Sequence, residues 1–137
     1  MTPHQATCVA IRGRGLLIEG PAGSGKSSLA LALIDRGAVL VGDDSLMLTA
    51  RDGRLFAHPH PRTEGLLEVR NVGLLPFPVC SEVHVNLLVM LDDAAPRYIE
   101  VAERRHHLDC TVPMLRLWPH SPVLALRAEQ SLARYGN

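Results

Sequence analysis

Residues 20–27, GPAGSGKS, constrain the possible fold of this chain more than any other stretch. They fit the pattern G-x-x-x-x-G-K-[ST] at every fixed position. An apolar run, GLLIEG (15–20), leads into them, and a strong helix-forming run, KSSLALALIDRG (26–37), follows them. A strand, a glycine-rich loop and a helix in this order are typical of a phosphate-binding loop (P-loop) in an α/β domain.

The chemistry of such a loop explains its residue types. Backbone N–H groups of a glycine-rich turn can surround phosphate oxygens, and the following helix directs its positive end at them. We expect Lys26 to reach the β- and γ-phosphates of ATP and Ser27 to hold Mg²⁺. Lys26 is also the only lysine among 14 basic residues. The predicted nucleotide-binding residues are Gly20, Pro21, Ala22, Gly23, Ser24, Gly25, Lys26, Ser27 and Ser28.

The remaining pattern is rich in strands. Hairpins are expected at 7–20, with Gly13 and Gly15 in the turn, and at 45–59 around RDGR. Further strands are expected at 38–42, 82–91 and 111–119, and a C-terminal helix at 121–136. Residues 59–78 are rich in Pro and Gly and favour irregular structure, with one helical turn at EGLLEV. The prediction is one α/β domain, residues 1–137, with a P-loop-containing mixed sheet and flanking helices.

Composition argues against several classes of partner. Asp and Glu together equal Lys and Arg, 14 each, so no large basic surface for nucleic acid is expected. The longest apolar runs are too short to cross a membrane. Three scattered cysteines suggest reduced thiols and a cytoplasmic location. The HPHP segment, with His58 and His60, is weak evidence for a metal site because it offers only two ligands.

Two pairs of acids compete for a role beside the phosphates. Asp43 and Asp44 end the strand after the P-loop helix, and Asp92 and Asp93 end the apolar run VNLLVML. In a parallel β-α-β unit, neighbouring strands end at one edge, so the first pair would lie beside the γ-phosphate and could accept a proton from a hydroxyl. The second pair resembles a Walker B acid, which would make the chain a P-loop small-molecule kinase or ATPase using Asp92.

Three features together resemble one bacterial family, the HPr kinase/phosphorylases. They are GPAGSGKSSLALALIDRGAVLVGDD (20–44), LLEVRNVG (66–73) in place of L-L-E-[IV]-R-G-x-G, and His4 just upstream of the first hairpin. The resemblance covers roughly residues 4–120 and only the catalytic domain, since usual members carry a further N-terminal domain. It implies a fold like the C-terminal domain of HPr kinase. It also implies ATP-dependent phosphorylation of a serine of HPr, the phosphocarrier of the sugar phosphotransferase system.

The resemblance also implies roles for single residues. Asp44 would accept the hydroxyl proton, Asp43 would support it, and His4 would work with the aspartate. Glu68 would be a second Mg²⁺ contact beside Ser27. The resemblance further implies catalytic roles for Lys26, for Arg70 and for Arg97 on a mobile loop.

Three points stay open at this stage. Many family members also run the reverse, phosphorylase reaction, but TVPMLRLWPHSP (111–122) does not match the family's dephosphorylation segment well. The family forms hexamers, so self-association is expected from the resemblance alone. A third interpretation is a nucleotide-binding regulator that keeps the same P-loop but does not turn over ATP. Intact ATP binding without phosphate transfer would distinguish such a regulator from a kinase.

Overall fold

The computed structural model describes all residues, 1–137, as eleven strands and two helices. In chain order they are β1 (Thr2–His4), β2 (Thr7–Ile11), β3 (Arg14–Glu19), α1 (Lys26–Asp35), β4 (Val39–Gly42), β5 (Leu46–Arg51), β6 (Arg54–Pro59), β7 (Leu66–Val69), β8 (Gly73–Pro76), β9 (Val83–Leu91), β10 (Glu103–His107), β11 (Cys110–Leu117) and α2 (Leu124–Tyr135).

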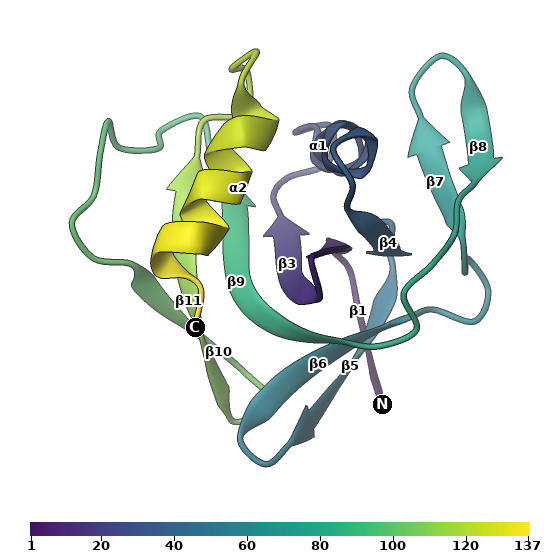
Figure 1. Cartoon of the computed structure of the whole chain (residues 1–137), viewed down its shortest axis with the longest axis horizontal. Coiled ribbons are helices and arrows are strands. Elements are labelled where there is room, and N and C mark those ends of the chain that lie inside the picture. Colours follow the sequence, from purple (N-terminus) through teal and green to yellow (C-terminus); the bar gives the residue numbers. More distant parts are fainter.

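Nine strands form one curled, mixed sheet. Its main path runs β1-β5-β6-β9-β3-β2-β4, and β11 adds to β9 with β10 beyond it. The long strand β9 joins the two halves, because its first residues pair with β6 and its later residues pair in parallel with β3 and β11. Figure 1 shows the result, with β5 and β6 turned beneath the β3–β9 part of the sheet and both helices on the opposite face.

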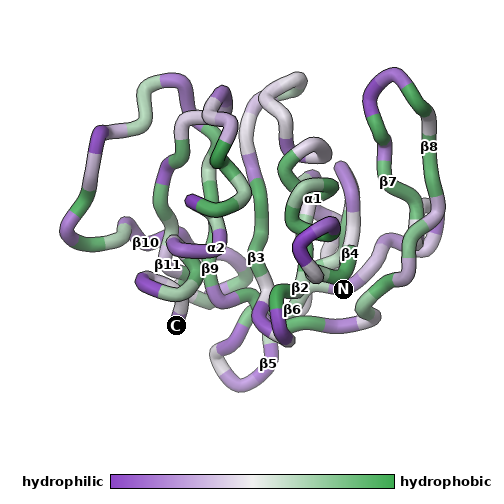
Figure 2. Tube along the Cα trace, turned by 45° about the horizontal axis from the view of Figure 1, so that its top comes forward, coloured by the Kyte–Doolittle hydropathy of each residue, from purple (hydrophilic) through white to green (hydrophobic).

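The curl divides the apolar residues into two cores. One core lies between the helices and the sheet and includes Ile18, Leu33 and Leu132. The other lies inside the curl and includes Leu17, Leu48 and Leu88. Strand residues therefore alternate between two apolar environments, which is why β3 and β9 are hydrophobic on both faces. Figure 2 shows this as green central strands with purple residues concentrated in the connecting loops.

Both predicted hairpins are present, and each has a two-residue turn. Arg12 and Gly13 have φ of 52° and 78°, and Asp52 and Gly53 have φ of 54° and 75°, as a type I′ turn requires. Gly15, however, is not a turn residue: it lies in β3 opposite Ala10. A Cβ there would lie 2.4 Å from the carbonyl oxygen of His84, so a close approach of two strands explains this glycine.

The segment 59–78 differs from the sequence prediction. EGLLEV forms no helical turn, because Leu66–Val69 is strand β7 of a separate two-stranded hairpin with β8. Asn71 lies in the turn with a φ of 70°, and Gly73, the first residue of β8, has a φ of 135°. Leu67 is fully buried in the core beneath α1, and this burial favours the extended form over local helix propensity. The hairpin projects at the right of Figure 1.

The two strands that end at the glycine-rich loop and at Asp43, β3 and β4, are not neighbours. β2 lies between them and is antiparallel to both β3 and β4. β3 and β4 consequently run in the same direction and end at the same edge of the sheet. The expectation that these two strands pair directly is wrong. Neither helix has the length and hydropathy that a membrane-spanning helix requires.

Candidate functional site

The loop between β3 and α1 carries the phosphate-binding pattern. Gly20, Gly23 and Gly25 have φ of 157°, 78° and 102°, and a Cβ on Gly20 would lie 2.7 Å from the hydroxyl oxygen of Ser24. No side chain caps the N-terminus of α1. The N–H groups of its first turn are thus left for another acceptor, which suits an anion.

The Lys26 amine lies over this loop. Its Nζ donates hydrogen bonds to the carbonyl oxygens of Gly20 at 2.8 Å and Pro21 at 3.2 Å. These bonds hold the positive charge beside the glycine-rich turn. The amine is also at the surface of an open cavity, so it is available to an incoming anion.

Asp43 connects three elements around the start of α1. Its Oδ1 accepts hydrogen bonds from the hydroxyls of Ser27 at 2.6 Å and Thr7 at 3.1 Å. Its Oδ2 accepts one from the backbone N–H of Glu68 at 2.9 Å. The residue is only 8% exposed, so these donors replace water around the carboxylate.

Asp44 is placed differently from its neighbour. It is exposed and has a φ of 62°, and its backbone N–H donates to the Thr7 hydroxyl oxygen at 3.3 Å. With this left-handed backbone conformation, Asp44 lines a cavity of about 440 Å³. The cavity is lined by Ala22–Ser28 of the loop and by Asp44, Glu68, Arg70, Pro119 and His120.

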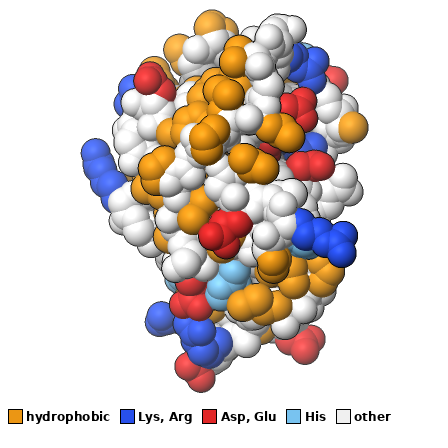
Figure 3. All heavy atoms as spheres, turned by 90° about the vertical axis from the view of Figure 1, so that its right-hand side faces the viewer, with side chains coloured by type: hydrophobic (Ala, Val, Ile, Leu, Met, Phe, Trp, Pro, Cys, Tyr) orange, Lys and Arg blue, Asp and Glu red, His pale blue; other side chains and the backbone are white.

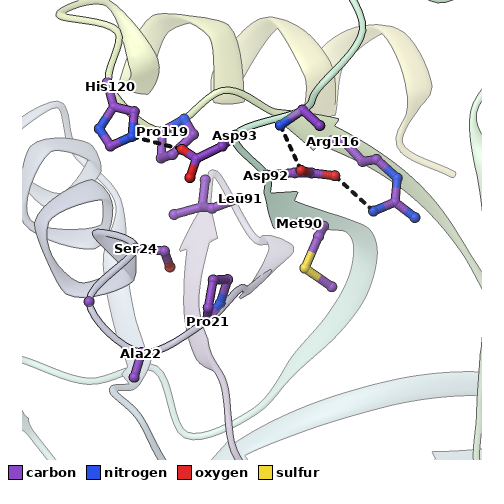
Figure 4. Close-up of a pocket in the computed structure, with 12 residues that line it drawn as sticks. Pro21, Ala22, Ser24, Met90, Leu91, Asp92, Asp93, Arg116, Pro119 and His120 are labelled. Atoms are coloured by element: carbon purple, nitrogen blue, oxygen red, sulfur yellow. Dashed lines mark hydrogen bonds and ion pairs between the residues drawn. The ribbon is translucent and has the colours of Figure 1, made fainter.

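The second acid pair borders an adjoining cavity, also of about 440 Å³, which shares part of the glycine-rich loop with the first (Figure 4). Asp92 accepts hydrogen bonds from the N–H of Ala94 at 2.8 Å and from Arg116 at 3.1 Å, and these donors hold its carboxyl pKa below the usual range. Asp93 pairs with His120 at 2.8 Å. Neither acid lines the cavity that holds Lys26 and Ser27. The acid bonded to Ser27 is therefore Asp43, which weakens the Asp92 alternative.

His4 lies in β1, and its Nε2 is 2.7 Å from Oε2 of Glu19, the last residue of β3. The Nε2 of His107 is 3.6 Å from the same oxygen, and Arg105 donates to the other oxygen at 3.5 Å. Burial raises the pKa of Glu19, but the hydrogen bond from His4 and the nearby charges outweigh it, so the pKa is lowered. Burial also lowers the pKa of His107. No hydrogen bond joins His4 to Asp43 or Asp44.

Comparison with known proteins identifies the family. The family model described as HPr Serine kinase C-terminal domain matches residues 1–97. The chain belongs to the HPr serine kinase C-terminal domain family. A relative named HPr kinase/phosphorylase from Bordetella petrii is 34% identical over 131 residues, covering 90% of this chain and 42% of the relative. One from Clostridium acetobutylicum is 40% identical over 91 residues, covering 61% of this chain and 30% of the relative. The chain thus spans about a third of the length of the HPr kinase/phosphorylases it matches.

A solved structure shares the whole architecture. It is described as the Hpr(Ser) kinase/phosphatase from Coxiella burnetii, with a TM-score of 0.84 and 27% identity. The match covers 97% of this chain and 95% of that one. The curled mixed sheet with two helices is therefore the fold of the HPr kinase C-terminal domain.

In this member of the family, most predicted site residues gather around one cavity. Lys26, Ser27, Asp44, Glu68 and Arg70 line it, and Asp43 lies behind it, bonded to Ser27. Two of the predicted catalytic residues lie elsewhere: His4 contacts Glu19, and Arg97 lies between β9 and β10 and borders neither cavity.

Sequence reasoning missed four residues near the site. Thr7 bonds both halves of the aspartate pair, and His120 lines both cavities. Glu19 and His107 surround His4. Thr7 and His107 lie in strands that carry no motif, so only their placement in space distinguishes them. For Glu19 the sequence offered one indication, because this acid directly precedes the first glycine of the loop.

Proposed function

We propose that this chain is an ATP-dependent protein serine kinase that phosphorylates HPr. The observation that carries the proposal is a pair of hydrogen bonds to Asp43, one from the Ser27 hydroxyl and one from the backbone N–H of Glu68. These bonds lie behind a cavity that Lys26 and Asp44 line. They bring the loop, the aspartate pair and the LLEVR segment to one place, and these belong to two of the three features that resemble the family. The names of the relatives support HPr as the acceptor.

The residues fit Mg-ATP. The uncapped helix, the glycine-rich loop and Lys26 suit the phosphates. Ser27 and Glu68 offer oxygen ligands, which Mg²⁺ prefers. When bound, Mg²⁺ neutralises negative charge on the phosphate oxygens. Arg70 adds a positive charge at the same cavity and is proposed to stabilise the transferred group.

The chemical step needs a proton acceptor and an oriented hydroxyl. The serine oxygen forms a bond to the γ-phosphorus as the bond from that phosphorus to the bridging oxygen of ADP breaks, and Asp44 takes the serine proton. Asp44 suits this role because it is exposed to the cavity, whereas both oxygens of Asp43 are occupied. Asp43 positions Ser27 and the turn that presents Asp44. Roles for His4 and Arg97 in the same step are proposed from the family resemblance, and so is the reverse phosphorylase reaction.

The decisive test is the intact mass of HPr after incubation with this chain and Mg-ATP. We expect one added phosphate on a serine, and a loss of about 10²–10⁴-fold in rate for Asp44→Asn with ATP affinity unchanged. Asp92→Asn is the matched control and should retain transfer. Transfer lost in Asp43→Asn but kept in Asp44→Asn would move the proton acceptor to Asp43.

Two results would contradict the proposal. A greater loss of ATP turnover in Asp92→Asn than in Asp44→Asn would favour the small-molecule kinase or ATPase. Unmodified HPr with ATP still bound would favour a different acceptor or a nucleotide-binding regulator.

Self-association and a cytoplasmic location are also proposed, the first from the family resemblance and the second from the reduced thiols. Large hydrophobic side chains are exposed on two projecting segments: Tyr98 and Val101 before β10, and Val72 and Leu74 on the β7–β8 hairpin. Figure 3 shows hydrophobic side chains gathered on the hairpin side of the molecule. Such exposure supports contacts with other chains.

A further inference from the structure

Three side chains from three strands meet on the inner side of the curl, next to the P-loop. His4 comes from β1, Glu19 from β3 and His107 from β10. Each offers one ligand atom, and these atoms all lie within 4.8 Å of one another. The side chains are 24%, 12% and 17% exposed, so the cluster is largely buried but can be reached from solvent.

We propose that His4, Glu19 and His107 form a Zn²⁺ site. Two imidazole nitrogens and one carboxylate oxygen are a ligand set that zinc adopts, with the fourth position left to water. The same set does not suit Mg²⁺, which prefers oxygen ligands throughout. The site is thus chemically distinct from the Ser27 and Glu68 oxygens proposed for Mg²⁺, and the proposal does not depend on the kinase function.

The distances agree with such an ion after small movements. Ligand atoms about 2.0–2.1 Å from a tetrahedral ion lie roughly 3.3 Å apart. The carboxylate oxygen Oε2 of Glu19 is 2.7 Å from Nε2 of His4 and 3.6 Å from Nε2 of His107. Shifts of a few tenths of an ångström would bring each nitrogen to this distance from the oxygen. The two nitrogens lie within 4.8 Å of each other and would have to approach to about 3.3 Å.

A second, independent observation also points to a ligand. Nε2 of His107 is fully buried and has no hydrogen-bond partner. A buried polar nitrogen without a partner is costly, and a metal ion would satisfy it. Arg105 donates to Oε1 of Glu19, which leaves Oε2 directed at the two imidazoles.

The site would connect the P-loop to two distant parts of the chain. Glu19 directly precedes Gly20, the first glycine of the loop. A bound ion would fasten this residue to β1 and β10, and it would occupy His4. A consequence that rests on the proposed function is that Zn²⁺ would slow phosphoryl transfer, because His4 would no longer be free to serve the aspartate pair.

The test is calorimetric titration of the chain, without a histidine tag, with Zn²⁺ alone as the probe and with Mg²⁺ in excess. We expect one ion to bind per chain. His107→Gln should weaken binding by more than the roughly 10- to 100-fold that loss of an outer-shell partner causes. The matched control is His106→Gln on the same strand, because His106 is exposed and bonds to Thr111; its affinity should be unchanged.

Two further measurements keep the result independent of folding and of catalysis. Zn²⁺ should raise the melting temperature of the unmodified chain, and Co²⁺ in its place should give the visible spectrum of a nitrogen and oxygen ligand set. Equal weakening by His106→Gln and His107→Gln, an intense thiolate band with Co²⁺, or no saturable binding would each overturn the proposal. Slower transfer plays no part in these readouts, so the site can stand if the kinase proposal fails.

Discussion

Thr7 shows how one side chain can position the acids of the site. It is fully buried, and its hydroxyl donates to Asp43 while accepting the backbone N–H of Asp44. The left-handed turn at Asp44 costs backbone energy, and the Thr7 hydroxyl offsets part of it. The position of Asp44 at the cavity therefore depends on a residue from β2.

Thr7→Val should remove this support without changing the shape of the side chain. The N–H of Asp44 would lose its partner, so we expect about 1–3 kcal/mol lower stability in urea unfolding. Phosphoryl transfer should fall while ATP binding stays close to normal. Thr7→Ser keeps the hydroxyl and is the control. Equal transfer rates for Thr7→Val and the unmodified chain would show that Thr7 does not position the site.

Gly15 matters for a steric reason at the same scale. Gly15→Ala would place a methyl group 2.4 Å from the backbone oxygen of His84, where the β3–β9 register shifts. We expect a loss of about 1–3 kcal/mol in the free energy of unfolding, as for overpacked cores. Gly13→Asn is the control, since Gly13 has open space around it and Asn tolerates a positive φ. A melting temperature for Gly15→Ala equal to that of the control would contradict this explanation.

At the scale of elements, the β7–β8 hairpin is fastened to the domain at few points. Leu67 is buried in the core under α1, and the next residue donates its N–H to Asp43. The packing of Leu67, with Val69 beside it against the same core, thus places Glu68 and Arg70 at the cavity. An isolated two-stranded hairpin has little stability of its own, so this anchor decides its position.

Leu67→Ala should loosen that anchor. A buried leucine truncated to alanine costs about 2–5 kcal/mol, which urea unfolding would measure. Transfer should fall further than ATP affinity, because the cavity would lose Glu68 and Arg70 but keep the P-loop. Leu74→Ala on the exposed side of the hairpin is the matched control and should leave both unchanged. Parallel losses of transfer and ATP affinity would mean that the hairpin does not act separately from the loop.

At the scale of the molecule, the curl of the sheet encloses a second core away from the helices. Cys8 and Cys110 lie in it, fully or almost fully buried, whereas Cys80 lies at its border and is partly exposed. Burial raises the pKa of the Cys8 thiol well above its usual value. Reactivity toward thiol reagents therefore reports whether the curl is closed.

We expect one thiol of the folded chain to react rapidly with a disulfide reagent and two to react only on unfolding. The reason is that only Cys80 has access to solvent, whereas Cys8 and Cys110 are buried and burial raises the pKa of the Cys8 thiol. Cys80→Ser should abolish the rapid phase, and Cys110→Ser should leave it unchanged. Rapid reaction of all three thiols would show that the curl opens readily under native conditions.

Much of the candidate site could be predicted from sequence because it is built from local signals. The P-loop, the helix that follows it and the hairpin turns at Gly13 and Gly53 each depend on residues close together in the chain. The common edge for the P-loop and Asp43 also followed from the β-α-β order, although the intervening β2 did not. The β7–β8 hairpin was missed because burial of Leu67 outweighs local preference.

By itself, the sequence determined the family, the position of the glycine-rich loop and the acids that are candidates to act beside it. Only the tertiary structure decided which acid bonds Ser27, where Thr7 acts and how His4 meets Glu19 and His107. The physical reason is the separation in sequence over which each interaction acts. Backbone preferences and motifs act over a few residues, whereas Arg105 and Glu19 are 86 residues apart and meet only because the sheet curls. Such contacts depend on the packing of the whole chain and leave no local pattern to detect.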